Sequence, residues 1–251
     1  MSHWLILALA GAAAGVINAI AGGGSLVSFP ALLFVGVPPV TANATNTLAI
    51  WPGAAASVWA YRDYIEEERP RAWVLAWPCL LGGLAGSVVL LHTPESAFRA
   101  VVPWLILFAC ALLAVQTPVA RWLAARGEPS TAGRVPVSLW LVQLAISFYG
   151  GYFGAGIGIL MLAAMGLVLR GSLQHANALK VLFATLINGV AVIYFLWARA
   201  ASLPEAALMA ATSLVGGYVG ARLAQKLPAR LMRGLVVTYG VGLAVHLFRT
   251  L

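Results

Sequence analysis

The sequence predicts an all-α polytopic membrane protein built from two inverted repeats, and three observations support this fold class. Apolar residues make up 62% of the chain and charged residues 9%, whereas soluble domains contain roughly half and a quarter. The apolar stretches 73–91, 101–115 and 176–197 have or approach the length of about 20 residues that crosses a bilayer as a helix. None shows the two-residue alternation of a transmembrane β-barrel strand. The third observation is an internal repeat.

The repeat becomes visible when the sequence is shifted by 134 positions, which aligns its halves without a gap over most of their length. The matched pairs include Gly22 and Gly156, Gly24 and Gly158, Asn43 and Asn177, Pro70 and Pro204, Gly82 and Gly216, Pro94 and Pro228, and Arg99 and Arg233. A fixed offset between many positions is the signature of a duplicated unit. We therefore expect a first transmembrane repeat over residues 1–117, a polar linker over 118–135, and a second repeat over 136–251.

Each half reads as five helical segments. In chain order they are 3–21, 25–35, 42–61, 72–91 and 96–116, then 136–153, 158–169, 174–197, 204–224 and 229–248. The first segment lacks the positive n-region of a signal peptide, so we interpret it as a retained transmembrane helix. Prolines at or shortly before the start of the fourth and fifth segments of each half fit helix starts. The second segment of each half is short, which gives eight long spans and two short helices.

The positive charges choose between two topologies. If the short segments return across the membrane, one side collects eleven cations, namely Arg62, Arg69, Arg71, Arg121, Arg126, Arg134, Arg170, Arg222, Lys226, Arg230 and Arg233. The other side then keeps Arg99, Arg199 and Arg249. If each short segment instead completes a broken span, the cations divide about evenly. The positive-inside rule favours the first arrangement. It makes the repeats inverted, as in many secondary transporters, and places both termini in the periplasm.

A glycine-rich break precedes each short helix, and we interpret the pair as a substrate-binding site. The breaks are Gly22-Gly23-Gly24-Ser25 and Gly154-Ala155-Gly156-Ile157-Gly158. Glycine permits close backbone approach, Ser25 is expected to cap the following helix, and a helix N-terminus attracts anions. The alternative is that these glycines only allow tight helix packing. For Gly82-Gly83 and Gly216-Gly217, helix packing is the favoured interpretation.

Polar residues inside the apolar runs extend the candidate site. Lys180 is the most prominent because a charge at membrane depth indicates function by default, although its side chain near a helix end is also suited to snorkelling. Asn43 and Asn177 either cap the third helix of each half or bind substrate, and Asn18 and Asn188 also lie within apolar runs. The predicted substrate-binding residues are Gly22, Gly23, Gly24, Ser25, Asn43, Asn46, Gly154, Gly156, Gly158, His175, Asn177 and Lys180.

The sequence lacks the residues and motifs that several other classes of function need. The seven acidic residues all lie in loops or at expected helix ends, so a carboxylate proton relay or cation cage is not expected. Cys79 and Cys110 have no metal-ligand spacing, and no catalytic constellation or nucleotide loop is present, so we expect neither an enzyme nor a cofactor or metal. The cations are dispersed between apolar runs, which excludes a nucleic-acid patch. An anion pathway remains.

The paired motifs resemble those of the TauE/SafE sulfite exporter family. In the first half they are Ala21–Ser25, then Phe29-Pro30-Ala31-Leu32, then Ala42–Asn46; in the second they are Gly150–Gly156 and Ala176–Lys180. The resemblance implies a permease of the bacterial inner membrane for sulfite or organosulfonates such as sulfoacetate. The second repeat has Ile157 and Ile159 where the first has Gly23 and Ser25. We therefore expect the two half-sites to be chemically unequal.

The sequence thus predicts a multi-pass secondary transporter that exports small sulfur-containing anions by alternating access. Proton coupling is left open, with His175 as the titrating group near the site. The alternatives are an uncoupled anion channel and a non-transporting membrane scaffold. The expected partners are a small anionic substrate and membrane lipid, with no nucleic acid, and a homodimer is left open.

Overall fold

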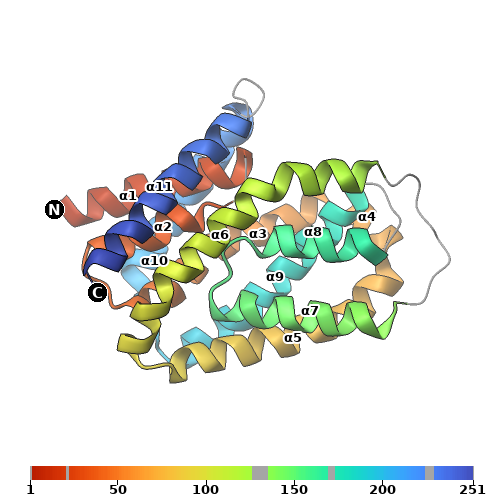
Figure 1. Cartoon of the computed structure of the whole chain (residues 1–251), viewed down its shortest axis with the longest axis horizontal. Helices are drawn as coiled ribbons and strands as arrows, with labels where there is room; N and C mark the ends of the chain where they lie inside the picture. Colours follow the sequence, from red (N-terminus) through yellow and green to blue (C-terminus); the bar gives the residue numbers. More distant parts are fainter. Residues whose placement is uncertain (1, 21–22, 126–134, 169–172, 224–228, 251) are drawn as a thin grey trace.

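The computed structural model describes residues 2–20, 23–125, 135–168, 173–223 and 229–250, and helices account for the regular structure throughout these ranges (Figure 1). In chain order the helices are α1 (Ser2–Ile20), α2 (Ser25–Phe34), α3 (Pro39–Ala60), α4 (Arg62–Glu67), α5 (Arg69–His92), α6 (Glu95–Ala124), α7 (Val137–Tyr152), α8 (Ile157–Val168), α9 (Leu173–Trp197), α10 (Leu203–Leu223) and α11 (Ala229–Thr250). Each predicted helical segment overlaps a helix in the described part of the chain, with bounds that differ by a few residues.

Three features of the helices differ from the sequence prediction. The short helix α4 was not expected, because its polar sequence has no apolar face to pack. Helix α6 continues past the expected end at residue 116 to Ala124, and it passes through Pro118. Helix α3 begins at Pro39, because proline fits the first turn, where a missing N–H leaves no bond unmade. The expected linker therefore begins inside α6, and most of its remainder lies outside the described residues.

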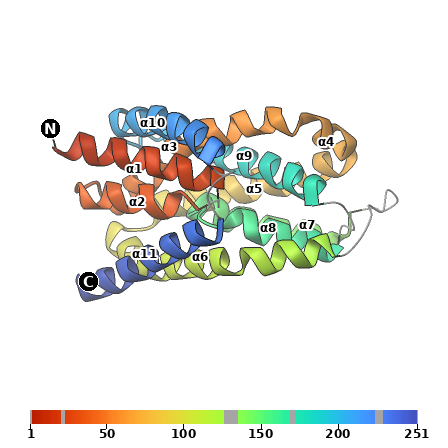
Figure 2. The ribbon, with the colours of Figure 1, turned by 90° about the horizontal axis from the view of Figure 1, so that it is seen from above.

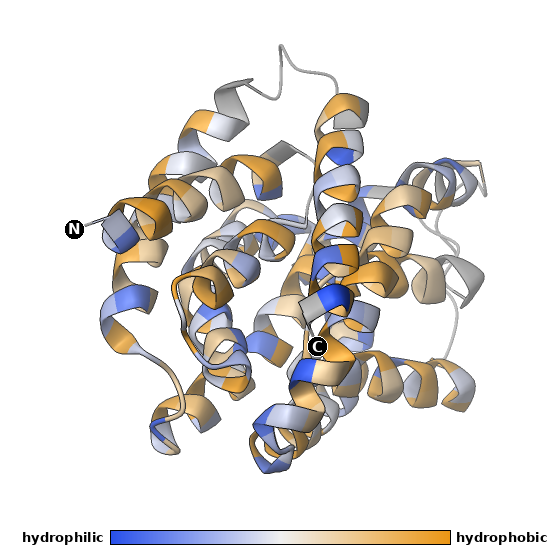
Figure 3. Ribbon diagram, turned by 60° about the vertical axis from the view of Figure 1, so that its left-hand side comes forward, coloured by the Kyte–Doolittle hydropathy of each residue, from blue (hydrophilic) through white to orange (hydrophobic). Residues whose placement is uncertain are grey.

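The described part of the chain has five helices long and apolar enough to cross a membrane, namely Ser2–Ala19, Arg69–His92, Glu95–Trp122, Gln174–Trp197 and Leu231–Arg249. Many large apolar side chains on the helices are exposed, among them Trp73, Trp77 and Trp104, and Figure 3 shows apolar residues along the outer helices. An apolar exterior of this kind is stable in contact with lipid. The protein is therefore a multi-pass membrane protein.

Helices α1 and α7 run in opposite directions (Figure 1). Both chain termini lie at one end of the molecule, whereas α4 and the C-terminal end of α6 lie at the other (Figure 1). Helix α1 begins at the end that holds the termini, and α7 begins at the opposite end. Helix α2 packs antiparallel to α1 (Figure 2) and returns toward the termini.

Glycines mediate the closest contacts between the halves. Helix α5 packs on α7, where a Cβ atom added at Gly82 would lie 2.7 Å from Ser147 Cβ. Helix α10 packs on α1, where a Cβ atom at Gly216 would lie 2.9 Å from Ala12 Cα. These contacts confirm the predicted role of both glycine pairs in helix packing. Because α1 belongs to the first half and α10 to the second, the halves interlock.

We expect Gly86→Val to lower the thermal unfolding midpoint of the purified protein by several degrees. A Cβ atom at Gly86 would lie 2.8 Å from the backbone nitrogen of Tyr152, which cannot move aside as a flexible side chain can. Overpacking of this kind costs about 1–3 kcal/mol. Gly242→Val in α11 is the matched control, since a Cβ atom there meets nothing within 4 Å. Equal midpoints for the two variants would contradict the packing described here.

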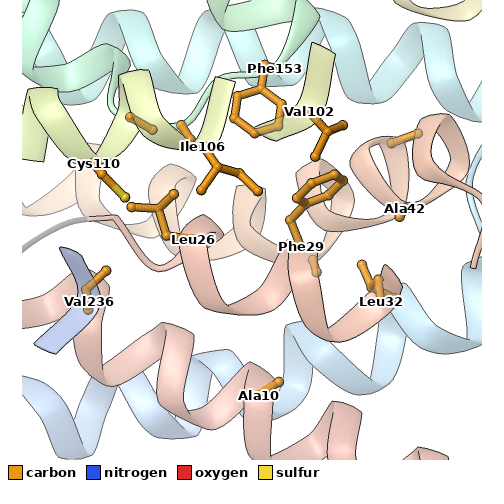
Figure 4. Close-up of a cluster of buried hydrophobic side chains, with 14 of the residues drawn as sticks. Ala10, Leu26, Phe29, Leu32, Ala42, Val102, Ile106, Cys110, Phe153 and Val236 are labelled. Carbon is orange, nitrogen blue, oxygen red and sulfur yellow. The ribbon is translucent and has the colours of Figure 1, made fainter. Parts of the chain in front are cut away.

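The short helix α2 is enclosed by other helices. Its Leu26, Phe29 and Leu32 are almost fully buried, and they pack with Ile106 of α6 and with Phe153, which follows α7 (Figure 4). The Phe29 and Phe153 rings meet edge to face, with centroids 5.4 Å apart. Non-helical backbone at membrane depth is tolerated where protein surrounds it. This packing therefore allows the chain to break before α2 and, likewise, before α8.

Candidate substrate-binding site

The two glycine breaks meet at one cavity of about 200 Å³. The first break contributes Gly23 and Ser25, and the second contributes Gly154, Gly156 and Gly158. The other walls come from α1, α3, α6, α8 and α9, and they include Asn18, Ile50, Ala109, Leu113, Gln116, Leu162, Lys180, Ala184 and Asn188. Segments separated by more than a hundred residues therefore form a single site.

Each break is held in shape by glycine and by a side chain of the preceding helix. Gly23 has φ +88°, and Gly154 and Gly156 each have φ +81°, a region that residues with a side chain rarely adopt. The Gly24 N–H donates to Asn18 Oδ1 at 2.8 Å in the first break. The Tyr149 hydroxyl donates to the Ala155 carbonyl at 2.7 Å in the second. Gly23 and Gly24 in the first break and Gly154–Gly156 in the second are thus held in fixed turns.

The expectation that Ser25 caps α2 is wrong. Ser25 is the first residue of the helix, and the N-cap is Gly24, which makes no side-chain capping bond. Helices α2 and α8 both have their N-terminal ends at the cavity, because their first residues, Ser25 and Ile157, line it. The N–H groups of Leu26 and Val27 in α2 and of Ile157 and Ile159 in α8 already donate to carbonyls of the breaks, so these ends offer an anion chiefly the partial positive charge of the helix dipole. Two such ends at one cavity favour an anion.

Lys180 supplies a full positive charge to the same cavity. Its Nζ donates to Asn177 Oδ1 at 2.9 Å, and its aliphatic stem runs beside Gly158, where a Cβ atom would lie 3.1 Å from Lys180 Cδ. Glycine at position 158 therefore leaves room for the lysine. The Lys180 side chain borders the cavity. No Asp or Glu is among the described residues that line the cavity.

Three neutral amides complete the polar lining, and the prediction had not assigned them to the site. They are Asn18 of α1, Gln116 of α6 and Asn188 of α9. Asn188 Nδ2 donates to the Ala184 carbonyl at 2.8 Å, and Gln116 Oε1 is buried without a hydrogen-bond partner. Asn18 and Asn188 were recognisable as polar residues in apolar runs. Gln116 gave no such signal because it lies at the expected end of its segment.

Three residues of the predicted site, two asparagines and a glycine, do not line the cavity. They connect or pack the helices that form its walls. Asn43 Nδ2 donates to the Tyr152 carbonyl at 2.9 Å and so links α3 to the end of α7. Asn46 Oδ1 accepts a hydrogen bond from the Ser28 hydroxyl at 2.5 Å, which links α3 to α2. Gly24 is buried against α1. Asn43 lies one turn inside α3 rather than at its start.

His175 lies apart from the cavity, contrary to the expectation that it titrates near the site. Its Nε2 is 2.7 Å from Glu67 Oε2 of α4, and its ring meets Tyr64 edge to face. Asn177 reaches the site only through its bond to Lys180. Gly22, the remaining predicted residue, lies outside the described residues.

A second cleft of about 530 Å³ adjoins the cavity and shares Asn18, Ile50 and Asn188 with it. This cleft lies between α1, α3, α9 and α10, and it reaches Ser57 and Tyr218 near the C-terminal ends of α3 and α10. Those ends point away from the chain termini (Figure 1). The central cavity therefore continues toward the end of the molecule that carries α4.

The sequence is similar to known proteins along nearly its whole length. A family model described as sulfite exporter TauE/SafE matches residues 7–247. The chain belongs to the TauE/SafE family. A probable membrane transporter protein of Haemophilus influenzae is 32% identical over 235 residues, which cover 92% of this chain and 89% of the relative. This TauE/SafE chain is accordingly a membrane transporter.

Two further relatives extend the comparison. The probable membrane transporter protein ORF9 of Sinorhizobium sp is 29% identical over 242 residues, which cover 93% of this TauE/SafE chain and 88% of the relative. The probable membrane transporter protein YfcA of Escherichia coli K12 is 24% identical over 228 residues, which cover 89% of this chain and 81% of the relative. No solved structure matches the chain.

Proposed function

We propose that this protein is a secondary transporter that exports small sulfur-containing anions, such as sulfite or an organosulfonate, across the bacterial inner membrane by alternating access. One observation carries the proposal: two helix N-termini and Lys180 converge on a single small cavity whose described lining has no acidic residue. The family description supplies the sulfur chemistry.

The composition of the cavity favours a singly charged oxyanion. Its described lining contains one cation, Lys180, and the neutral side chains Asn18, Gln116 and Asn188. Hydrogen bonds from an ammonium to an oxyanion are about twice as strong as neutral ones. The amides and the backbone N–H groups can bind the remaining oxygens without adding charge. A dianion such as sulfate would keep an uncompensated negative charge in a protein interior, which is costly.

The opposite directions of α1 and α7 (Figure 1) support an inverted-repeat mechanism. The 134-residue offset relates Asn18, Ser213 and Gly217, which line the open cleft, to Tyr152, Cys79 and Gly83. At the second set of positions, Cys79 is fully buried, and a Cβ atom at Gly83 would lie 3.0 Å from Val190 Cγ1. One face of the site is thus open and its counterpart is packed, which fits a one-side-open state of an alternating-access cycle.

The charges of the described residues support periplasmic termini. Arg62, Arg69 and Arg71 lie on or beside α4, and Arg121 lies near the C-terminal end of α6. These cations share the end of the molecule opposite the chain termini (Figure 1). The positive-inside rule assigns the cation-rich end to the cytoplasm.

A flux assay in proteoliposomes tests the proposed function. We expect saturable efflux of radiolabelled sulfite, which near pH 7 is partly the singly charged hydrogensulfite, or of a singly charged organosulfonate from loaded vesicles, with the dianion sulfate moved at least about 10-fold more slowly. Efflux that never saturates and ignores an imposed pH gradient would favour the uncoupled channel. No flux of any oxyanion, together with no stabilisation of the purified protein by these anions, would favour the scaffold.

A further inference from the structure

Another cleft, which is lined by two arginines, lies between α6 and α11. It is distinct from the central cavity and from the cleft between α1, α3, α9 and α10. It has a volume of about 550 Å³ and is lined by Leu113, Ala114, Thr117, Pro118, Arg121, Arg233, Gly234 and Val237. Arg121 stands on the part of α6 that extends beyond its predicted end, so this extension brings a second guanidinium to the cleft. We propose that this cleft binds the phosphate headgroup of an anionic phospholipid, with the acyl chains lying along α6 and α11.

The described lining of the cleft carries two cations, which suits an anionic ligand. Arg233 donates a hydrogen bond to the Thr117 hydroxyl, which holds its guanidinium against α6, and Arg121 is exposed. No acidic residue is among the described residues of the cleft. The only Asp or Glu of α6 or α11 in the described chain is Glu95, at the far end of α6, where it accepts a hydrogen bond from the Val40 N–H. Two guanidiniums can bind one phosphate through several charge-assisted hydrogen bonds.

The surroundings of the cleft select a lipid over a free anion. Both walls are candidate membrane spans, and only 17% of the apolar window of α11 is buried. Leu235 is 58% exposed and Val115 is 45% exposed, so apolar surface continues from the cleft along both helices. Leu113, which is 2% exposed, separates the cleft from the central cavity. Basic pockets between spans at the cation-rich side are suited to anionic headgroups.

The internal repeat provides a matched control site. Arg99 is the counterpart of Arg233, and it lines a cavity of about 380 Å³ at the other end of the molecule. The other residues of that cavity are Leu33, Gly36, Val37, Pro38, Pro39, Val102 and Leu247, which carry no charge. A single exposed arginine there lacks the second guanidinium that the proposed lipid site has.

Thermal unfolding of the purified protein with added lipid tests the proposal. Dioleoyl phosphatidylglycerol is expected to raise the midpoint by about 5 °C, and dioleoyl phosphatidylcholine by less than about 1 °C. Arg121→Gln should lose most of the phosphatidylglycerol shift, and Arg121→Gln combined with Arg233→Gln should lose all of it. Arg99→Gln should keep the full shift. Thr117→Val removes the bond to Arg233 but keeps both charges, so it should retain most of the shift even if its starting midpoint is lower.

Three outcomes would overturn the lipid site. The first is a full phosphatidylglycerol shift in the double variant, and the second is an equal loss of the shift in Arg99→Gln. The third is an arginine-dependent shift of the same size with millimolar sulfite or inorganic phosphate in place of lipid, which would make the cleft a site for soluble anions. Because Lys180 remains intact in all these variants, saturable sulfite efflux can persist when the lipid shift is lost, so the two proposals fail separately.

Discussion

Lys180→Gln is expected to lower sulfite efflux from proteoliposomes by about 30-fold or more. The substitution removes the one full positive charge among the described residues of the cavity. A hydrogen bond to a charged group contributes about 1.5–3 kcal/mol, and about 2 kcal/mol corresponds to a factor of roughly 30 in rate or affinity. Initial rates over a range of sulfite concentrations measure the effect. Glutamine is nearly isosteric with the stem of lysine and preserves a polar end.

Two companion variants separate charge from structure. Lys180→Arg keeps the charge and should retain part of the flux, reduced by the crowding against Gly158. Asn177→Ala removes only the acceptor that orients Nζ and should lower flux less than Lys180→Gln does. Parental rates in Lys180→Gln, at equal protein content in the vesicles, would show that the anion does not depend on this lysine.

Gly156→Val should reduce flux to the background of empty vesicles. Gly156 has φ +81°, and a side chain in the left-handed region costs about 1–2 kcal/mol. A Cβ atom there would lie 3.1 Å from Leu112 Cδ1, beside the cavity. The larger side chain therefore strains the break and presses on α6 at Leu112, next to Leu113, which lines the cavity. Efflux per folded protein molecule is the quantity to compare.

Gly36→Val is the control for backbone strain alone. Gly36 also has positive φ, at +90°, but a Cβ atom there meets nothing within 4 Å and Gly36 does not line the central cavity. We expect this variant to lower the unfolding midpoint while keeping efflux per folded molecule. If Gly36→Val abolished flux as completely as Gly156→Val, strain and not obstruction of the site would explain both results.

Much of the fold was predictable because the length and apolar composition of a segment indicate a membrane helix. The gapless offset between the halves also located the breaks, since glycine tracts inside apolar sequence have few uses other than packing and turns. Helix α4 was missed because its stability comes from its place between α3 and α5 and from contacts such as His175 with Glu67. The extension of α6 was missed because the prediction ended with the apolar run, whereas Ala, Arg and Leu after Pro118 remain good helix formers.

The candidate site was predictable in part, and the misses have a common cause. The repeat led us to predict that Gly23, Gly156 and Lys180 belong to one site. All three line the cavity. Sequence spacing could not distinguish a side chain that faces the cavity from one that holds a wall, so Asn43 and Asn46 were grouped with them. Gln116 lies on α6, which approaches both breaks although no break belongs to it. Only the packing of the helices reveals such a residue.

The location of the bound anion tests the central claim most directly. Selenite has the shape and charge of sulfite, and the selenium atom scatters X-rays anomalously, so a crystal soaked with selenite locates the anion without ambiguity. We expect an anomalous peak inside the cavity, within hydrogen-bonding reach of Lys180 Nζ and the N-terminal ends of α2 and α8, and no such peak in Lys180→Gln crystals. A peak only in the cleft of Arg121 and Arg233, or none at a concentration that saturates efflux, would contradict the site described here.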